Sequence, residues 1–258
     1  MNRKTFSLVF VAGCLNNQPG MKTDLLYHSL LKESLPGILQ AEVNIDLLTY
    51  HAYNQLTPAI EEKLGKKKAD ILILFIRPFP YMVLNKPVIK YDTPGNRKVR
   101  GIHPAIFSSG EYRWPGFYSK YISEGVPGSG ERRPVNLLQE INLLTGVMMG
   151  LHRWSVGYVL RELDKVVSLC GRTDTRLILL GIPPAAGSPA GNLVCCSLNR
   201  FLVRKATREN LDYVDIFTKK DGRGNAILCG DGRHFSEAGH AFLAGMLSPV
   251  ITGMLSES

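Results

Sequence analysis

Residues 70–76 read Asp-Ile-Leu-Ile-Leu-Phe-Ile, a run of apolar side chains that follows a single carboxylate. A short, unbroken apolar run of this kind is typical of a strand that is buried on both faces, as in a parallel sheet. Shorter or less continuous apolar stretches occupy residues 5–12, 42–50, 176–181 and 213–217. We therefore predict a central sheet of five strands.

Helices are predicted between these strands, at residues 23–40, 56–64, 136–171, 199–210 and 236–251. The first should be interrupted near Pro36 and Gly37, because both residue types disfavour a helix interior. Residues 136–171 fit one long helix or a pair broken within residues 146–150. Strands that alternate with helices predict a parallel sheet covered on both faces, in one domain over residues 1–258.

Residues 77–134 depart from this alternation. They are rich in proline, glycine, tyrosine and basic residues and show little periodicity. A loop region of this length inside a compact domain is usually functional or flexible. We interpret it as an insertion after the third strand that packs over the carboxyl edge of the sheet, where sites form in such folds.

The chain has 258 residues and a net charge of +9, from 31 Lys and Arg against 22 Asp and Glu. This charge favours an anionic small-molecule substrate or an acidic protein partner such as a carrier protein. No nucleic-acid-binding motif is present, so we expect no nucleic acid partner. No unbroken apolar run approaches the roughly 18–20 residues that cross a bilayer, so we expect no transmembrane segment.

The five cysteines are odd in number and follow no disulfide or metal-ligand spacing: Cys14, Cys170, Cys195, Cys196 and Cys229. Reduced thiols in the cytoplasm are the simplest interpretation, and neither a metal nor another cofactor is expected. The alternative is a lipoprotein anchored through Cys14, because the basic residues Arg3 and Lys4 and the apolar residues 6–11 precede Ala12-Gly13-Cys14. That apolar run is shorter than the roughly 7–15 residues of a secretory signal, and it also suits the first strand.

Residues 229–240, Cys-Gly-Asp-Gly-Arg-His-Phe-Ser-Glu-Ala-Gly-His, hold the clearest chemical signal in the chain. Asp231 stands three residues before His234, and an apolar segment follows. A carboxylate beside an imidazole selects one tautomer of the ring and stabilises its protonated form. Asp231 and His234 are therefore candidates for an orienting group and a general base, whereas we expect His240, within the last helix, to be structural.

This block resembles the last block of the SGNH/GDSL hydrolases. The resemblance covers nearly the whole chain in element order and is strongest over residues 176–184 and 199–247. It implies a three-layer α/β/α flavodoxin-like fold with a five-stranded parallel sheet, and an esterase, lipase or acylhydrolase chemistry. The family carries a serine nucleophile after the first strand in a Gly-Asp-Ser motif, and a Gly and an Asn further on supply oxyanion donors.

The first block of this chain, residues 11–16, reads Val-Ala-Gly-Cys-Leu-Asn and contains no serine. Residues 11–16 can be aligned with the Gly-Asp-Ser motif of the family in two registers. In one, Cys14 occupies the position of the nucleophile. In the other, Leu15 occupies it, and catalysis by that route is lost. The second block would fall near His51, where no glycine is present, and the third has Arg77-Pro78 where the family has Gly-x-Asn-Asp. Arg77, Asn16 and His51 are the candidates for oxyanion or substrate binding, since a guanidinium can bind an oxyanion.

Two functions follow from the resemblance. The first is an acyl hydrolase or acyltransferase that acts on an ester, thioester or amide acyl group, with Cys14, Asp231 and His234 as catalytic residues. The alternative is a catalytically inactive protein of the same fold that binds a ligand or a partner protein, because the serine, glycine and asparagine of the family are all missing.

Overall fold

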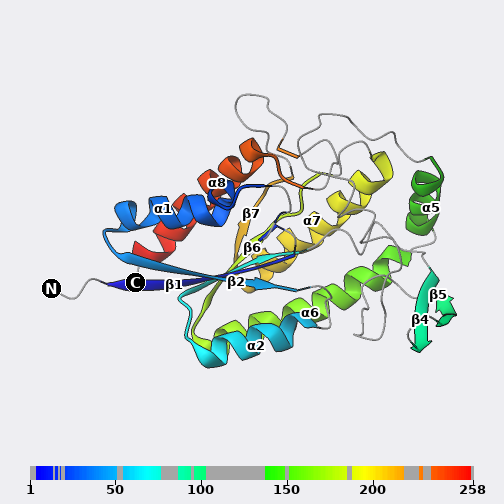
Figure 1. The fold of residues 1–258 in the computed structure, drawn as a ribbon, viewed down its shortest axis with the longest axis horizontal. Coiled ribbons are helices and arrows are strands. Elements are labelled where there is room, and N and C mark those ends of the chain that lie inside the picture. The colour runs from blue at the N-terminus through cyan, green and yellow to red at the C-terminus, as the bar shows by residue number, and fades with distance from the viewer. Residues whose placement is uncertain are drawn as a thin grey trace.

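The structure is a computed structural model. It describes residues 4–13, 15–16, 18, 21–50, 55–76, 87–93, 96–102, 137–148, 151–184, 188–217, 227–228 and 234–256. A five-stranded sheet runs through its centre in the order β2-β1-β3-β6-β7 (Figure 1). All neighbouring strands of this sheet are parallel. The strands are β1 (Thr5–Ala12), β2 (Glu42–Thr49), β3 (Ile71–Phe75), β6 (Arg176–Leu180) and β7 (Asp212–Val214).

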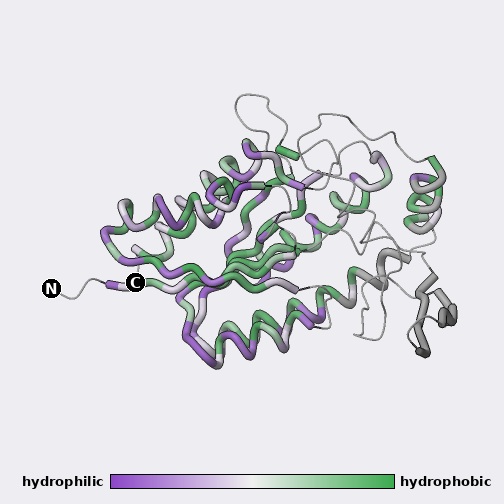
Figure 2. Tube along the Cα trace, in the orientation of Figure 1, coloured by the Kyte–Doolittle hydropathy of each residue, from purple (hydrophilic) through white to green (hydrophobic). Residues whose placement is uncertain are grey.

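The apolar strands bury side chains on both faces of the sheet, which confirms the predicted three-layer α/β/α fold. Phe6, Leu8 and Phe10 of β1 pack into one core cluster, while Val9 and Val11 pack into the other. This division follows from the two-residue side-chain period of a strand. The strands are hydrophobic along most of their length (Figure 2), as expected where helices cover both faces.

One face is covered by α1 (Tyr27–Leu39) and α8 (Glu237–Ser256), which lie side by side (Figure 1). The other face is covered by α2 (Leu56–Lys66), α6 (Leu151–Thr173) and α7 (Pro189–Glu209). A shorter helix, α5 (Leu137–Met148), packs against α6 and α7. The predicted helix pair over residues 136–171 is therefore confirmed as α5 and α6.

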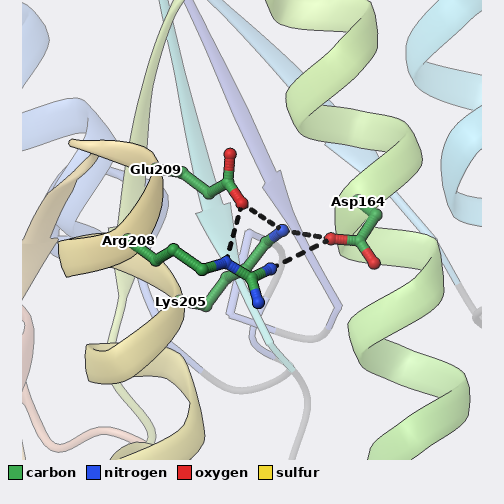
Figure 3. Close-up of polar contacts among 4 residues, drawn as sticks. All are labelled: Asp164, Lys205, Arg208 and Glu209. Atoms are coloured by element: carbon green, nitrogen blue, oxygen red, sulfur yellow. Dashed lines mark hydrogen bonds and ion pairs between the residues drawn. The ribbon is translucent and has the colours of Figure 1, made fainter.

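A buried lysine joins α6 to α7 (Figure 3). Lys205 has only 6% of its side chain exposed, and its Nζ pairs with Asp164 of α6 and, at 3.0 Å, with Glu209 of α7. Arg208 also contacts both carboxylates. The two acids thus neutralise a charge that would be costly to bury alone.

The start of α7 differs from the sequence prediction by about half of the helix: α7 begins at Pro189 rather than at residue 199. Ser188 caps it, because its Oγ accepts a hydrogen bond of 2.9 Å from the N–H of Gly191. Glu140 of α5 extends the cap, with Oε1 on the Ser188 hydroxyl and Oε2 at 2.9 Å from the N–H of Ala190. Proline at the first helical position and serine before it are ordinary helix-start signals.

The first helix is also interrupted at a different place. A 3₁₀ turn, η1 (Thr23–Leu25), ends at Leu26, and α1 then continues through Pro36 to Leu39. The predicted break near Pro36 and Gly37 is wrong. Leu31 and Leu35 are fully buried against the sheet, and this packing outweighs the hydrogen bond that a proline in the last turns cannot donate.

Part of the insertion forms a hairpin that the sequence reading missed. Antiparallel strands β4 (Pro87–Thr93) and β5 (Asn96–Ile102) pair with each other, separately from the central sheet. The hairpin and α5 lie at the end of the molecule opposite the two chain termini (Figure 1). The rest of residues 77–134 lies outside the described residues.

By length and composition alone, α8 is apolar enough to cross a membrane, with a mean hydropathy of 1.4 in its most apolar window. Glycine, serine and proline interrupt its apolar residues, so the sequence shows no unbroken run. Leu243, Leu247 and Ile251 are fully buried in the core cluster shared with α1 and the sheet. In this fold α8 is therefore used as a core helix.

The strand β1 lies inside the sheet, paired with β2 on one side and β3 on the other. Cleavage before Cys14, as in a lipoprotein, would remove this strand together with the core residues that it contributes. Localisation in the cytoplasm, or anchoring through Cys14, stays a prediction.

Candidate active site

The strand order places a topological switch point between β1 and β3. The chain leaves β1 through α1 toward β2, and it leaves β3 toward β6 on the opposite side. Neighbouring strands whose connections diverge in this way leave a gap beyond their carboxyl ends, which is where open α/β sheets bind ligands. Position 14 follows β1, and position 77 follows β3. In sequence, both predicted residues follow strands that flank this switch point, and they lie outside the described residues.

Two of the six predicted site residues lie in the described part of the chain, namely Asn16 and His234. Cys14, His51, Arg77 and Asp231 lie outside the described residues. Described residues close to Cys14 and Asp231 in sequence show how the loop after β1 and the His234 segment are held.

The segment that carries His234 is held by backbone pairing before α8 begins. Phe235 forms an isolated antiparallel bridge with Leu228, and the N–H of Ser236 donates a hydrogen bond of 3.0 Å to the carbonyl of Ile227. The Ser236 hydroxyl caps α8 by accepting a bond of 3.0 Å from the N–H of Gly239. His234, which is half-buried, thus lies directly before a segment that is held by backbone hydrogen bonds.

Asn16 is 2% exposed and binds the backbone of two strands. Its Nδ2 donates to the carbonyl oxygens of Phe10, at 2.9 Å, and Leu48, at 3.1 Å. Its Oδ1 accepts a hydrogen bond of 2.7 Å from the Tyr27 hydroxyl. Both side-chain N–H groups are therefore used within the protein. These contacts assign Asn16 a structural role in holding the loop after β1, and its contribution to oxyanion binding stays a prediction.

A second buried amide, Gln18, joins the loop after β1 to the His234 segment. It is 2% exposed, and its Nε2 donates a hydrogen bond of 2.8 Å to the carbonyl of Phe235. Its Oε1 lies 3.2 Å from Nε2 of His240, which is fully buried in α8. The Nδ1 atom of His240 accepts a bond of 3.3 Å from the N–H of Tyr27. The first loop, α1 and the last block of the chain are thus joined by hydrogen bonds.

The imidazoles around this junction are kept neutral. Burial, together with the smaller effects of the nearby His28 and His234, lowers the pKa of His240 to about 4. Burial also lowers the pKa of His28, although the hydrogen bond between its Nε2 and the carbonyl of Asn16, at 3.0 Å, opposes this shift. The electrostatic effect of His234 on His240 indicates that the candidate base lies within interaction range of the buried network.

Two of the described cysteines, Cys170 and Cys195, are unsuited to nucleophilic chemistry. Burial raises the pKa values of the Cys170 and Cys195 thiols to about 12, so both stay protonated at neutral pH. Cys196 is half-buried. Within the described ranges, no group of three or more His, Cys, Asp or Glu side chains is arranged to hold a metal ion.

The sheet order and the three layers define the class: the chain has the SGNH/GDSL hydrolase fold. It is similar to a lipolytic protein of the G-D-S-L family from Veillonella parvula DSM 2008, with a TM-score of 0.58 and 12% identity over 96% of this chain and 98% of that one. It is similar to a lipase/acylhydrolase from Enterococcus faecalis, with a TM-score of 0.54 and 12% identity over 97% and 96%.

An acetylxylan esterase from Geobacillus stearothermophilus is similar as well, with a TM-score of 0.54 and 13% identity over 96% of this chain and 94% of that one. At these identities the likeness shows the fold. The sequence itself matches no protein-family model and no curated protein. The divergence expected from the altered sequence blocks is consistent with this result.

The sequence reading missed Gln18, Tyr27 and His28 as parts of the site. Gln18 stands in a loop without periodicity, and its partners are more than 200 residues away in the chain. The one available signal was the pair Tyr27 and His28, two polar side chains that open a helix on its buried face. His240 was expected to be structural, and it is fully buried.

Proposed function

We propose that this protein is an acyl hydrolase or acyltransferase in which Cys14 is the nucleophile, His234 the general base and Asp231 the group that orients it. The observation that carries the proposal is the hydrogen bond between Gln18 and the carbonyl of Phe235. Gln18 lies four residues after Cys14, and Phe235 follows His234 directly. The bond therefore holds the two loops that carry the proposed nucleophile and base against each other.

The burial of Leu15 supports the register that assigns Cys14 as the nucleophile. Leu15 is 4% exposed and belongs to the core cluster on the α1 and α8 face. The side chain at position 15 therefore belongs to the core, whereas a nucleophile must be able to contact the substrate. The burial of Leu15 therefore favours the register in which Cys14 is the nucleophile.

The proposed reaction has two acyl-transfer steps. His234 accepts the proton of the Cys14 thiol, and the sulfur attacks the acyl carbonyl to form a C–S bond. The tetrahedral intermediate then expels the leaving group, which takes the proton from His234, and a thioester remains on Cys14. Water or another acceptor gives its proton to His234, attacks the thioester and releases the thiol.

Oxyanion stabilisation is assigned to the backbone N–H groups after β1 and to Arg77. The Asn16 side chain already donates both of its N–H groups to backbone carbonyls. A missing side-chain donor typically costs an oxyanion hole about 100- to 1000-fold in rate, and a guanidinium at the end of β3 would offset part of this loss. An arginine and the net charge of +9 favour an anionic acyl substrate or an acidic carrier.

Selective alkylation tests this proposal. The protein is treated with limiting iodoacetamide at pH 7, and the modified cysteines are located by peptide mapping. Cys14 should react at least tenfold faster than the half-buried Cys196, which serves as the internal reference. His234→Ala should remove this advantage, and Cys14→Ala and His234→Ala should each abolish turnover of 4-nitrophenyl acetate.

Full turnover by Cys14→Ala would rule out the mechanism. Equal reactivity of Cys14 and Cys196 would instead support the alternative, a catalytically inactive protein that binds a ligand or a partner protein. The absence of a serine from residues 11–16 is the observation that favours this alternative.

A further inference from the structure

The hydrogen bonds around His240 admit one arrangement of protons. The backbone N–H of Tyr27 can only donate, so the His240 Nδ1 that it faces at 3.3 Å carries no proton. The proton of the neutral ring is therefore on Nε2, which lies 3.2 Å from Oε1 of Gln18. This orientation turns the amide N–H of Gln18 toward the carbonyl of Phe235. The tautomer and the amide orientation are inferred from the network, in which every donor faces an acceptor.

The surroundings of His240 hold this ring in place. It stacks on the Tyr27 ring, with centroids 6.0 Å apart and planes 11° from parallel, and it contacts the Phe235 ring at 5.7 Å. Its titratable neighbours are His28 and His234. A second proton on Nδ1 would set two donors face to face and break the contact with α1.

Stability alone does not account for a buried Gln–His pair. Apolar side chains of the same shape would fill the space at similar free energy, because a buried hydrogen bond contributes little beyond the cost of desolvating its groups. An apolar pair would remove the hydrogen bond that Gln18 donates to the carbonyl of Phe235, however. The polar pair therefore specifies the position of the backbone that adjoins His234.

We propose that Gln18 and His240 are positioning residues: together they hold the His234 segment at a set distance from the loop that carries Cys14. This inference rests on the proposed function for its catalytic consequence. The expected role is to place the imidazole of His234 within reach of the Cys14 thiol, since misplacement by about 1 Å can cost about 100-fold in rate.

Two variants keep the shape of the pair but remove its hydrogen bonds. Gln18→Met retains the length of the side chain, and His240→Phe retains an aromatic ring. Leu247→Ala is the matched control, because Leu247 is fully buried in the same helix and contacts neither loop through a hydrogen bond. It should destabilise the fold by a cavity effect and leave the position of His234 unchanged.

The first readout is NMR of protein labelled with 15N-histidine, with His234→Ala used to assign the His234 signals. We expect His240 in the Nε2–H tautomer, and a shift of the His234 signals in Gln18→Met and in His240→Phe but not in Leu247→Ala. A His240 that carries its proton on Nδ1, or His234 signals unchanged in both folded variants, would overturn the proposal.

The second readout is the alkylation rate of Cys14 by iodoacetamide. Gln18→Met and His240→Phe should each lower this rate at least tenfold, and the double variant should lose no more than the larger single loss, because the two residues act as one unit. Additive losses of alkylation rate in the double variant would show that Gln18 and His240 do not act as one unit. If wild-type Cys14 reacts no faster than Cys196, the proposed function fails, while the tautomer of His240 and the response of His234 still decide the positioning role.

Discussion

The hydroxyl of Tyr27, at the start of α1, donates a hydrogen bond of 2.7 Å to Oδ1 of Asn16, in the loop after β1. Both residues are buried, and burial raises the pKa of Tyr27 far above its ordinary value, so the hydroxyl stays a donor. Asn16 in turn reaches the ends of two strands. The orientation of the loop after β1 therefore depends on a residue of the following helix.

Tyr27→Phe should lower the free energy of unfolding by about 1–3 kcal/mol, because it leaves the Asn16 oxygen buried without its donor. Urea unfolding measures this loss. The change should also slow alkylation of Cys14, since the loop after β1 loses one of its anchors.

Tyr213→Phe is the control for the same chemistry elsewhere in the fold. The Tyr213 hydroxyl donates a bond of 2.9 Å to Oδ1 of Asn199, which also accepts the N–H of Ile182. The acceptor keeps one partner, so the loss should be smaller, about 0.5–1.5 kcal/mol, with no change in Cys14 alkylation. Slower alkylation in both variants would refute a specific role for Tyr27.

Gly239 marks a close approach between α8 and the segment that precedes His234. A Cβ atom at this position would lie 1.9 Å from the carbonyl oxygen of Ile227 and 2.8 Å from its carbon. Both are backbone atoms and cannot rotate away. Gly239→Ala should therefore cost at least about 1–3 kcal/mol, measured by urea unfolding, and should separate Leu228 from Phe235.

Gly245, on the exposed face of the same helix, supplies the comparison. No atom lies within 4 Å of the position that its Cβ would take. Gly245→Ala should stabilise the protein by about 0.5–1 kcal/mol, because alanine favours a helix more than glycine does. Equal effects of the two substitutions would mean that the contact at Gly239 does not constrain the fold.

The stability of the protein should fall between pH 6.5 and pH 4. The pKa of His240 is about 4 in the folded protein against an ordinary value of 6.5, so the unfolded chain binds a proton that the native state excludes. The stabilisation is present above pH 6.5 and decreases as the pH falls toward 4. The two pKa values correspond to about 3 kcal/mol, and the lowered pKa of His28 acts in the same direction.

Urea unfolding at several pH values tests this expectation. His240→Phe should have a shallower pH dependence than the wild type in the same interval, because the variant has no buried imidazole at this position to protonate. Carboxyl groups titrate in both proteins and cancel in the comparison. Identical slopes would show that His240 does not carry the effect.

The sheet was predictable from the sequence because its strands are encoded locally. Residues 71–75 are apolar on both faces, and burial on both sides is what a central parallel strand requires. The predicted helix boundaries were wrong where tertiary contacts determine them. The burial of Leu31 and Leu35 stabilises α1 beyond Pro36. Glu140 completes the cap of α7 although it lies nearly fifty residues earlier in the chain.

The candidate site was predictable only in part, for the same reason. Asp231 and His234 are only three positions apart in sequence, so their spacing suggested a dyad. The network of Gln18, Tyr27 and His240 has no local pattern, because the fold alone brings these residues together. The serine of the family was the expected landmark, and its absence from residues 11–16 left the register of Cys14 and Leu15 open.

The bond between Gln18 and Phe235 spans 217 positions of the chain, and the bond between Gln18 and His240 spans 222. During synthesis, the loop after β1 emerges first but acquires these partners only when the last helix has been made. A chain that is truncated by proteolysis or by early termination before residue 235 lacks both partners. An enhanced alkylation rate at Cys14 would then indicate that translation and folding had both been completed. Incomplete products would lack this enhancement.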